Sequence, residues 1–285
     1  MDERSVKGIV KYKEDMNTSE AHTPFAVVIG LILFGISSLA LAQQGVPPNY
    51  LRAKNTALDI IVQSDSFRAI EYISALGEPE EVMGVFELVT RDLYWEKKDL
   101  TAAMAMGRAA IQYGLVTSLQ MADGDQKTAF TLRSQAKSIA YDLASFSWPG
   151  WDEAGIEISS SDLIFGQDAA KTNLRLAVSL RKGDLPMSRA FWVLGAHHLA
   201  VDKLPGARKA FVEGIKYATA AEAKEFELLL RGYVYLVDML EEPGNRELLV
   251  EFDFVKRQLL RSQDGKFYSD QLETAYRVFT KEEEL

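Results

Sequence analysis

Residues 189–218 read RAFWVLGAHHLAVDKLPGARKAFVEGIKYA, and this stretch decides the fold. Two apolar segments with helical spacing flank a Lys-Leu-Pro-Gly turn at residues 203–206. The small residues Gly195, Ala207 and Gly214 recur where two antiparallel helices must approach closely, whereas Phe191 and Phe211 supply the bulk that fills the seam. The stretch therefore predicts a helical hairpin whose two helices pack tightly.

This order of small and aromatic residues resembles one tetratricopeptide repeat (TPR). The hairpin departs from that family at His198, where Tyr is usual, at Gly214, where Ala is usual, and at Thr219, where the closing Pro is missing. The resemblance covers roughly a tenth of the chain and implies an architecture of stacked helix pairs.

The same spacing recurs elsewhere in the chain. Gly195 and Gly232 lie 37 residues apart, as do Ala170 and Ala207, close to the family period of about 34 residues. We therefore expect about five helix pairs in series over residues 51–285. The expected fold is all-α, with antiparallel helix pairs stacked as a TPR-like α-solenoid behind an N-terminal hydrophobic membrane segment.

An irregular insertion at residues 147–161, SWPGWDEAGIEISSS, interrupts the pattern and cannot form one helix. Loops on a rigid scaffold are free to carry specific function. Trp148 and Trp151 would form an aromatic lip that contacts a peptide or a sugar, or else plug the edge of the solenoid where the repeat lapses. Ser161 or Asp162 is expected to cap the helix that follows.

The N-terminal region predicts membrane targeting. Residues 25–42 read FAVVIGLILFGISSLALA, and no formally charged side chain occurs between residues 21 and 51. At about 1.5 Å per residue, a helix over this segment nearly spans a hydrocarbon core of about 30 Å. We therefore divide the N-terminal region into a cytoplasmic polar arm at 1–23, a membrane segment at 24–42 and a Pro-containing spacer at 43–50.

Two interpretations of the membrane segment compete, and a buried helix of the soluble domain is a third. Small residues before Gln43 suit a signal peptide cleaved after Ala42, whereas the long arm with five acidic residues suits an uncleaved anchor. Four Lys and Arg precede the segment and two follow it closely, which keeps the arm cytoplasmic. The chain is then a single-pass inner-membrane protein of the bacterial cell envelope with its C-terminal domain outside the cytoplasm, or a periplasmic protein after cleavage.

Composition and motifs argue against several functions. A formal charge of -9 disfavours nucleic acid as a partner, and the absence of Cys excludes disulfides, thiolate metal sites and a cysteine nucleophile. His197 and His198 point about 100° apart on a helix and cannot share a metal ion, and His22 precedes the membrane segment. Because no nucleophile or phosphate-loop motif occurs either, we expect no enzyme, no cofactor and no metal.

The alternative is an enzyme or carbohydrate-binding module that uses residues 148–162. Four carboxylates of this region could pair for acid/base chemistry or bind calcium, although their spacing matches no known ligand loop. A pocket that gathers them with Arg133 or Lys137 would favour this alternative. The four residues are Asp152, Glu153, Glu157 and Asp162.

The TPR resemblance also implies a binding face, because the first helix of each repeat lines the concave side. It assigns to this face Arg189, Trp192, Ala196 and Leu199 of one repeat and Phe226, Leu229, Tyr233 and Leu236 of the next. A surface this apolar is expected to be shielded from water, either by a partner or by the C-terminal helix. The leading hypothesis is a non-catalytic scaffold or adaptor that binds a protein or peptide on this face, and a homodimer through a self-complementary groove is another possibility.

Overall fold

The structure is a computed structural model that describes residues 45–263 and 265–281. All of these residues belong to the second of two compact units, Leu41–Leu285. The expected arm at 1–23 and membrane segment at 24–42 lie outside the described residues. Within the described ranges, no helix combines the length and the hydropathy that crossing a bilayer requires.

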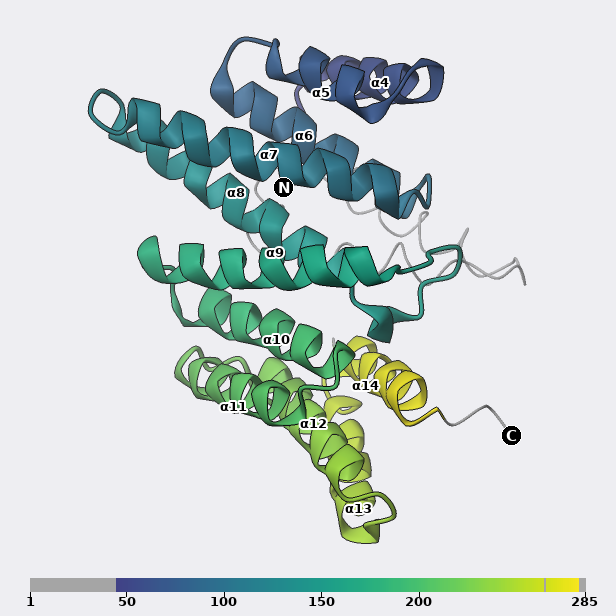
Figure 1. Cartoon of the computed structure of the whole chain (residues 1–285). Helices are drawn as coiled ribbons and strands as arrows, with labels where there is room; N and C mark the ends of the chain where they lie inside the picture. Colours follow the sequence, from purple (N-terminus) through teal and green to yellow (C-terminus); the bar gives the residue numbers. More distant parts are fainter. Residues whose placement is uncertain (1–44, 264, 282–285) are drawn as a thin grey trace, which may run out of the picture. The chain divides into compact units, whose positions relative to one another are not determined.

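The described chain is all-α, and its helices follow one another as five antiparallel pairs and a final single helix (Figure 1). The pairs are α4 (Pro48–Gln63) with α5 (Ser66–Ser74), α6 (Pro79–Trp95) with α7 (Leu100–Met121), α8 (Gln126–Phe146) with α9 (Ser160–Ser179), α10 (Asp184–Ala200) with α11 (Leu204–Ala220), and α12 (Lys224–Glu241) with α13 (Arg246–Leu259), before α14 (Gly265–Thr280). The expected series of stacked helix pairs is confirmed at this level.

The pairs stack in two layers. The first helices α4, α6, α8 and α10 contact one another in turn, and the second helices α5, α7 and α9 do the same. We call the layer of first helices, which continues into α12, the inner layer. Each pair thus buries its apolar stripe against the preceding and the following pair, as a solenoid requires.

The small residues face adjoining helices as predicted. A Cβ atom added to Gly195 would lie 2.6 Å from Phe211 Cε1, and one added to Gly232 would lie 2.4 Å from Leu272 Cδ1. Ala207 is fully buried. Because side chains of neighbouring helices fill the space above each glycine, the interhelical distance depends on the missing Cβ.

Three of the turns between helices share one backbone geometry. Each places a single non-glycine residue in the left-handed region two positions after a helix ends, with φ of 49° at Arg181, 54° at Asp202 and 54° at Glu222. This conformation costs roughly 1 kcal/mol for a residue with a Cβ atom. Its recurrence marks a structural repeat that side-chain identity alone does not display.

Local sequence explains two helix starts that differ from expectation. Helix α4 begins at Pro48, inside the expected spacer, because proline is accepted in the first helical turn. Helix α9 is capped by Ser159, and Asp162 completes the capping box by bonding back to the Ser159 backbone N–H. The expected cap at Ser161 or Asp162 is therefore corrected to Ser159.

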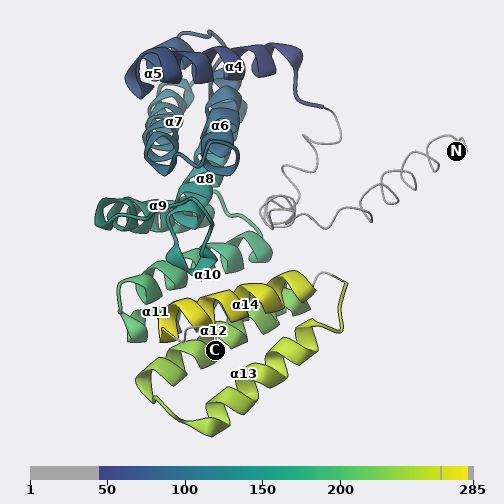
Figure 2. The same cartoon turned by 90° about the vertical axis from the view of Figure 1, so that its right-hand side faces the viewer.

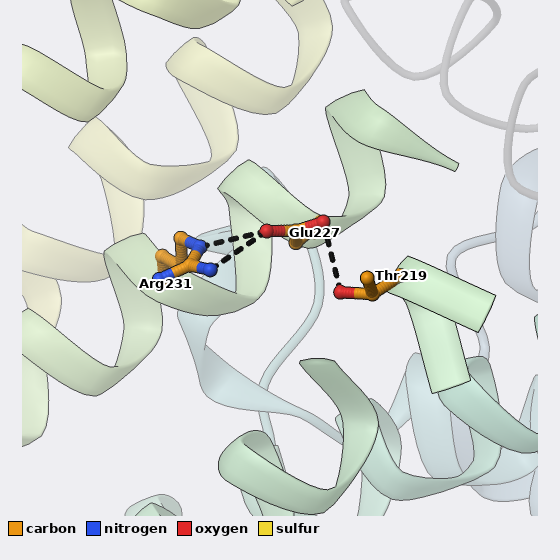
Figure 3. A network of polar contacts seen from close by, with 3 residues as sticks. All are labelled: Thr219, Glu227 and Arg231. Atoms are coloured by element: carbon orange, nitrogen blue, oxygen red, sulfur yellow. Dashed lines mark hydrogen bonds and ion pairs between the residues drawn. The ribbon is translucent and has the colours of Figure 1, made fainter. Parts of the chain in front are cut away.

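A polar network joins α11 and α12 where the TPR pattern lacks its closing proline. Thr219 donates a hydrogen bond from its hydroxyl to Glu227 Oε2 at 2.9 Å, and Arg231 Nη2 pairs with Glu227 Oε1 at 2.8 Å (Figure 3). The hydroxyl of Thr219 thus connects the end of one helix to the start of the next.

Candidate functional site

The insertion between α8 and α9 folds inward. Its short 3-10 helix η1 (Pro149–Trp151) holds Trp148 fully buried, with ring centroids 5.6 Å from Trp192, 5.8 Å from Tyr233 and 6.1 Å from Phe279. Trp151 is half-buried, and its Nε1 donates to the Ser145 carbonyl at 2.9 Å. The two tryptophans form a plug rather than an exposed aromatic lip.

Helix α14 packs against α12 of the inner layer and against η1 of this plug (Figure 2). Gln271 Nε2 donates a hydrogen bond to the Tyr233 hydroxyl at 2.8 Å, and Arg277 Nη2 pairs with Asp152 Oδ2 at 2.9 Å. The second contact joins residues 125 positions apart in sequence. The C-terminal helix therefore takes the covering role that the sequence left as an alternative to a partner.

Most of the expected binding face is buried in the structure. Trp192, Ala196 and Tyr233 are fully buried, and Leu199 and Phe226 are 3% and 4% exposed. Leu229 and Leu236 are also fully buried. The TPR resemblance predicted an open apolar groove, and this expectation is corrected: the residues form a covered core. A self-complementary dimer would also need that groove to be open. Of the eight residues assigned to this face, only Arg189 retains appreciable exposure.

The carboxylates of the insertion have separate structural roles. Asp152 pairs with Arg277, Glu153 pairs with Lys98 at 2.6 Å, and Asp162 caps α9. Neither Arg133 nor Lys137 takes part in these contacts. The enzyme alternative requires these carboxylates to lie together with those two cations. The described residues show no such cluster.

An open polar pocket of about 460 Å³ adjoins the insertion. Its walls come from the turn between α6 and α7 and from the loop before α9, and they comprise Lys98, Asp99, Leu100, Thr101, Gly155, Ile156 and Glu157. Asp99 already caps α7 by accepting from the Ala102 amide at 2.9 Å. Within the described ranges, no three His, Asp or Glu side chains come together as metal ligands.

The two histidines point to different partners. His197 is fully buried, its Nε2 lies 2.7 Å from the Ala144 carbonyl, and burial lowers its pKa to about 4. A neutral ring that donates this bond from Nε2 suits such a site. His198 is half-buried, and a Cβ added to Gly206 would lie 3.3 Å from its ring, so His198 packs against the α10–α11 turn.

Arg189 belongs to a group of cations that we call the basic strip: Arg133 and Lys137 on α8, Lys182 in the turn before α10, and Arg189 on α10. Arg133 Nη2 donates to Ser179 Oγ at 3.0 Å, and Lys182 Nζ donates to Ser134 Oγ at 2.9 Å. None of the four cations takes part in an ion pair formed by the described residues.

Electrostatics connects the members of the strip. Burial lowers the pKa of Lys137 to about 8, and the positive charges of Lys182 and Arg189 contribute to the lowering, while Asp142 opposes it. Tyr141, one turn further along α8, is buried, and its hydroxyl has no hydrogen-bond partner. Burial raises the pKa of Tyr141, and the positive charge of Arg189 opposes this rise.

Asp142 follows Tyr141 on α8 and accepts a hydrogen bond from α6. Arg91 Nε donates to Asp142 Oδ2 at 2.9 Å, and Arg91 Nη2 pairs with Glu87 Oε1 at 2.6 Å. The second carboxylate oxygen of Asp142 has no partner. Burial outweighs the attraction of Arg91 and raises the pKa of Asp142 to about 7.

Compared with known proteins, the chain matches no family model and no curated protein. Its candidate site therefore rests on geometry alone. The basic strip was not predicted as a unit, because its members are scattered between residues 133 and 189. The available signal was the pair of like charges at Arg133 and Lys137, four residues apart on one helix face.

Proposed function

We propose that this chain is a non-catalytic, TPR-like scaffold or adaptor of the bacterial cell envelope that binds a protein or peptide partner. One observation carries the proposal: a rigid stack of helix pairs presents Arg189 and its neighbouring cations without carboxylate partners among the described residues. Rigid display of groups that are already positioned lowers the entropy cost of binding. The stack supplies the rigidity and the basic strip supplies the recognition groups.

The proposal moves the contact surface away from the covered residues. Trp192 is buried against the two tryptophans of the insertion and Tyr233 is buried under α14, so a partner meets the strip rather than the apolar inner layer. The membrane segment at 24–42 would hold the domain at the inner membrane, outside the cytoplasm, or would direct it to the periplasm after cleavage at Ala42. The apolar sequence of that segment and the excess of Lys and Arg before it support this location.

Site-specific photocrosslinking of the full chain in its native membrane tests the proposal. A photoreactive residue at Asp184, which is exposed in the first turn of α10, lies between Lys182 and Arg189 in sequence and leaves the strip intact. The matched control is a photoreactive residue at Lys209, which is exposed on α11. We expect one defined crosslinked partner from position 184 and none from position 209.

Mass spectrometry of the crosslinked product identifies the partner and the N-terminal peptide of the chain together. An N-terminal peptide that begins at Gln43 would establish cleavage, and one from the polar arm would establish an anchor. The proposed function is wrong if positions 184 and 209 give the same products, or if position 184 gives none.

A further inference from the structure

The basic strip is an exception to the charge pairing of this molecule. The chain carries a formal charge of -9, and acids are abundant enough to pair most cations. Arg208 pairs with Asp238 at 2.7 Å and Arg231 with Glu227 at 2.8 Å, even though both arginines are largely exposed. The strip instead places like charges together, and such an arrangement is relieved when an anion binds.

The strip is also organised in advance for a ligand. The hydroxyl groups of Ser179 and Ser134 hold Arg133 and Lys182 in place, and neutral hydroxyls leave both positive charges uncompensated. The Lys182 ammonium lies 4.9 Å from the Phe130 ring, which restricts it further.

The layout of the strip indicates the kind of anion. On α8 the strip runs from Arg133 to Lys137, four residues or about 6 Å at about 1.5 Å per residue. Its other two cations come from separate segments, Lys182 from the turn before α10 and Arg189 from the second turn of α10. Cations from three segments suit a ligand with several carboxylates, and an extended peptide, which advances about 3.3 Å per residue, places every second side chain at about the Arg133–Lys137 spacing.

We infer that the basic strip binds a carboxylate-rich peptide segment of the partner, whose Asp or Glu side chains pair with Arg133, Lys182 and Arg189. This inference rests on the proposed function, because it specifies the chemistry of the partner at the same surface. Lys137, one turn after Arg133 on α8, adds to the positive potential that attracts the segment.

Binding of defined peptides to the purified full chain in detergent tests the inference. A fluorescent hexaglutamate peptide is the probe, hexaglutamine is the uncharged control, and inorganic phosphate at matched ionic strength is the small-anion competitor. We expect hexaglutamate alone to bind, with an affinity that falls as salt is added. Lys182→Gln and Arg189→Gln should each weaken binding by about fivefold, the effect of one ion pair.

Lys209→Gln is the matched control, because it removes the same charge from an exposed position on α11. Circular dichroism of each variant confirms that the helices remain folded. Equal losses in all three variants would show non-specific attraction, and displacement of the peptide by phosphate would show a small-anion site; either result overturns the inference. If position 184 crosslinks to a partner but hexaglutamate does not bind, the inference of a carboxylate-rich segment is wrong and the proposed function still holds.

Discussion

Replacing Asp142 by Asn should change how stability depends on pH. The Asp142 side chain is 2% exposed, and burial raises its pKa from 3.8 to about 7. Between these two values the unfolded chain has released this proton while the folded chain retains it. Stability contributed by Asp142 is therefore present below about pH 4, falls as the pH rises towards 7, and stays low above it.

The size of this effect follows from the two pKa values. A gap from 3.8 to about 7, at about 1.4 kcal/mol for each pKa unit, corresponds to a loss on the order of 4 kcal/mol between pH 4 and pH 7.5. Asn cannot ionise, and its carbonyl oxygen can still accept the hydrogen bond from Arg91 Nε. We therefore expect Asp142→Asn to approach the wild type in stability at pH 4.5 and to exceed it at pH 7.5.

Urea unfolding of the full chain in detergent, followed by tryptophan fluorescence at several pH values, measures the difference. His197 contributes in the opposite direction, because its lowered pKa of about 4 makes stability fall as the pH drops from 6.5 to 4. That contribution is the same in both proteins and cancels in the comparison. Parallel curves, or a wild type that gains on the variant as pH rises, would show that attraction to Arg91 outweighs burial and would refute the argument.

Two further predictions concern packing and use the same unfolding assay. Trp148→Ala should destabilise the fold by about 3–5 kcal/mol, because it empties a fully buried aromatic site. Trp148→Phe should cost clearly less, because Phe keeps an aromatic ring in the site and the indole N–H that is lost has no partner. Equal losses would contradict this account of the plug. Gly195→Ala should destabilise the fold by about 1–3 kcal/mol, because the new Cβ would lie 2.6 Å from Phe211. The control Gly124→Ala places its Cβ in open space and should be neutral or stabilising. Similar effects at both glycines would count against close packing.

The apolar face of α12 shows what the sequence could not predict about the site, namely which element covers it. The apolar face of α12 was recognised, and a covering helix was one of its two expected occupants. Choosing α14 over a partner requires the contacts of Gln271 with Tyr233 and of Arg277 with Asp152. These contacts join distant segments, and no local pattern encodes which amphipathic helix will fill a given face.

The series of helix pairs could be predicted from the sequence, because helix formation and close packing depend on short-range spacing. Gly195, Ala207 and Phe211 stand within one turn-linked hairpin and carry that information locally. The burial of Trp148, the packing of α14 on α12 and the grouping of Lys182 with Arg133 became visible only in the folded chain. Burial and electrostatic potential at a point depend on every element packed around it, so they exist only once the whole stack is assembled.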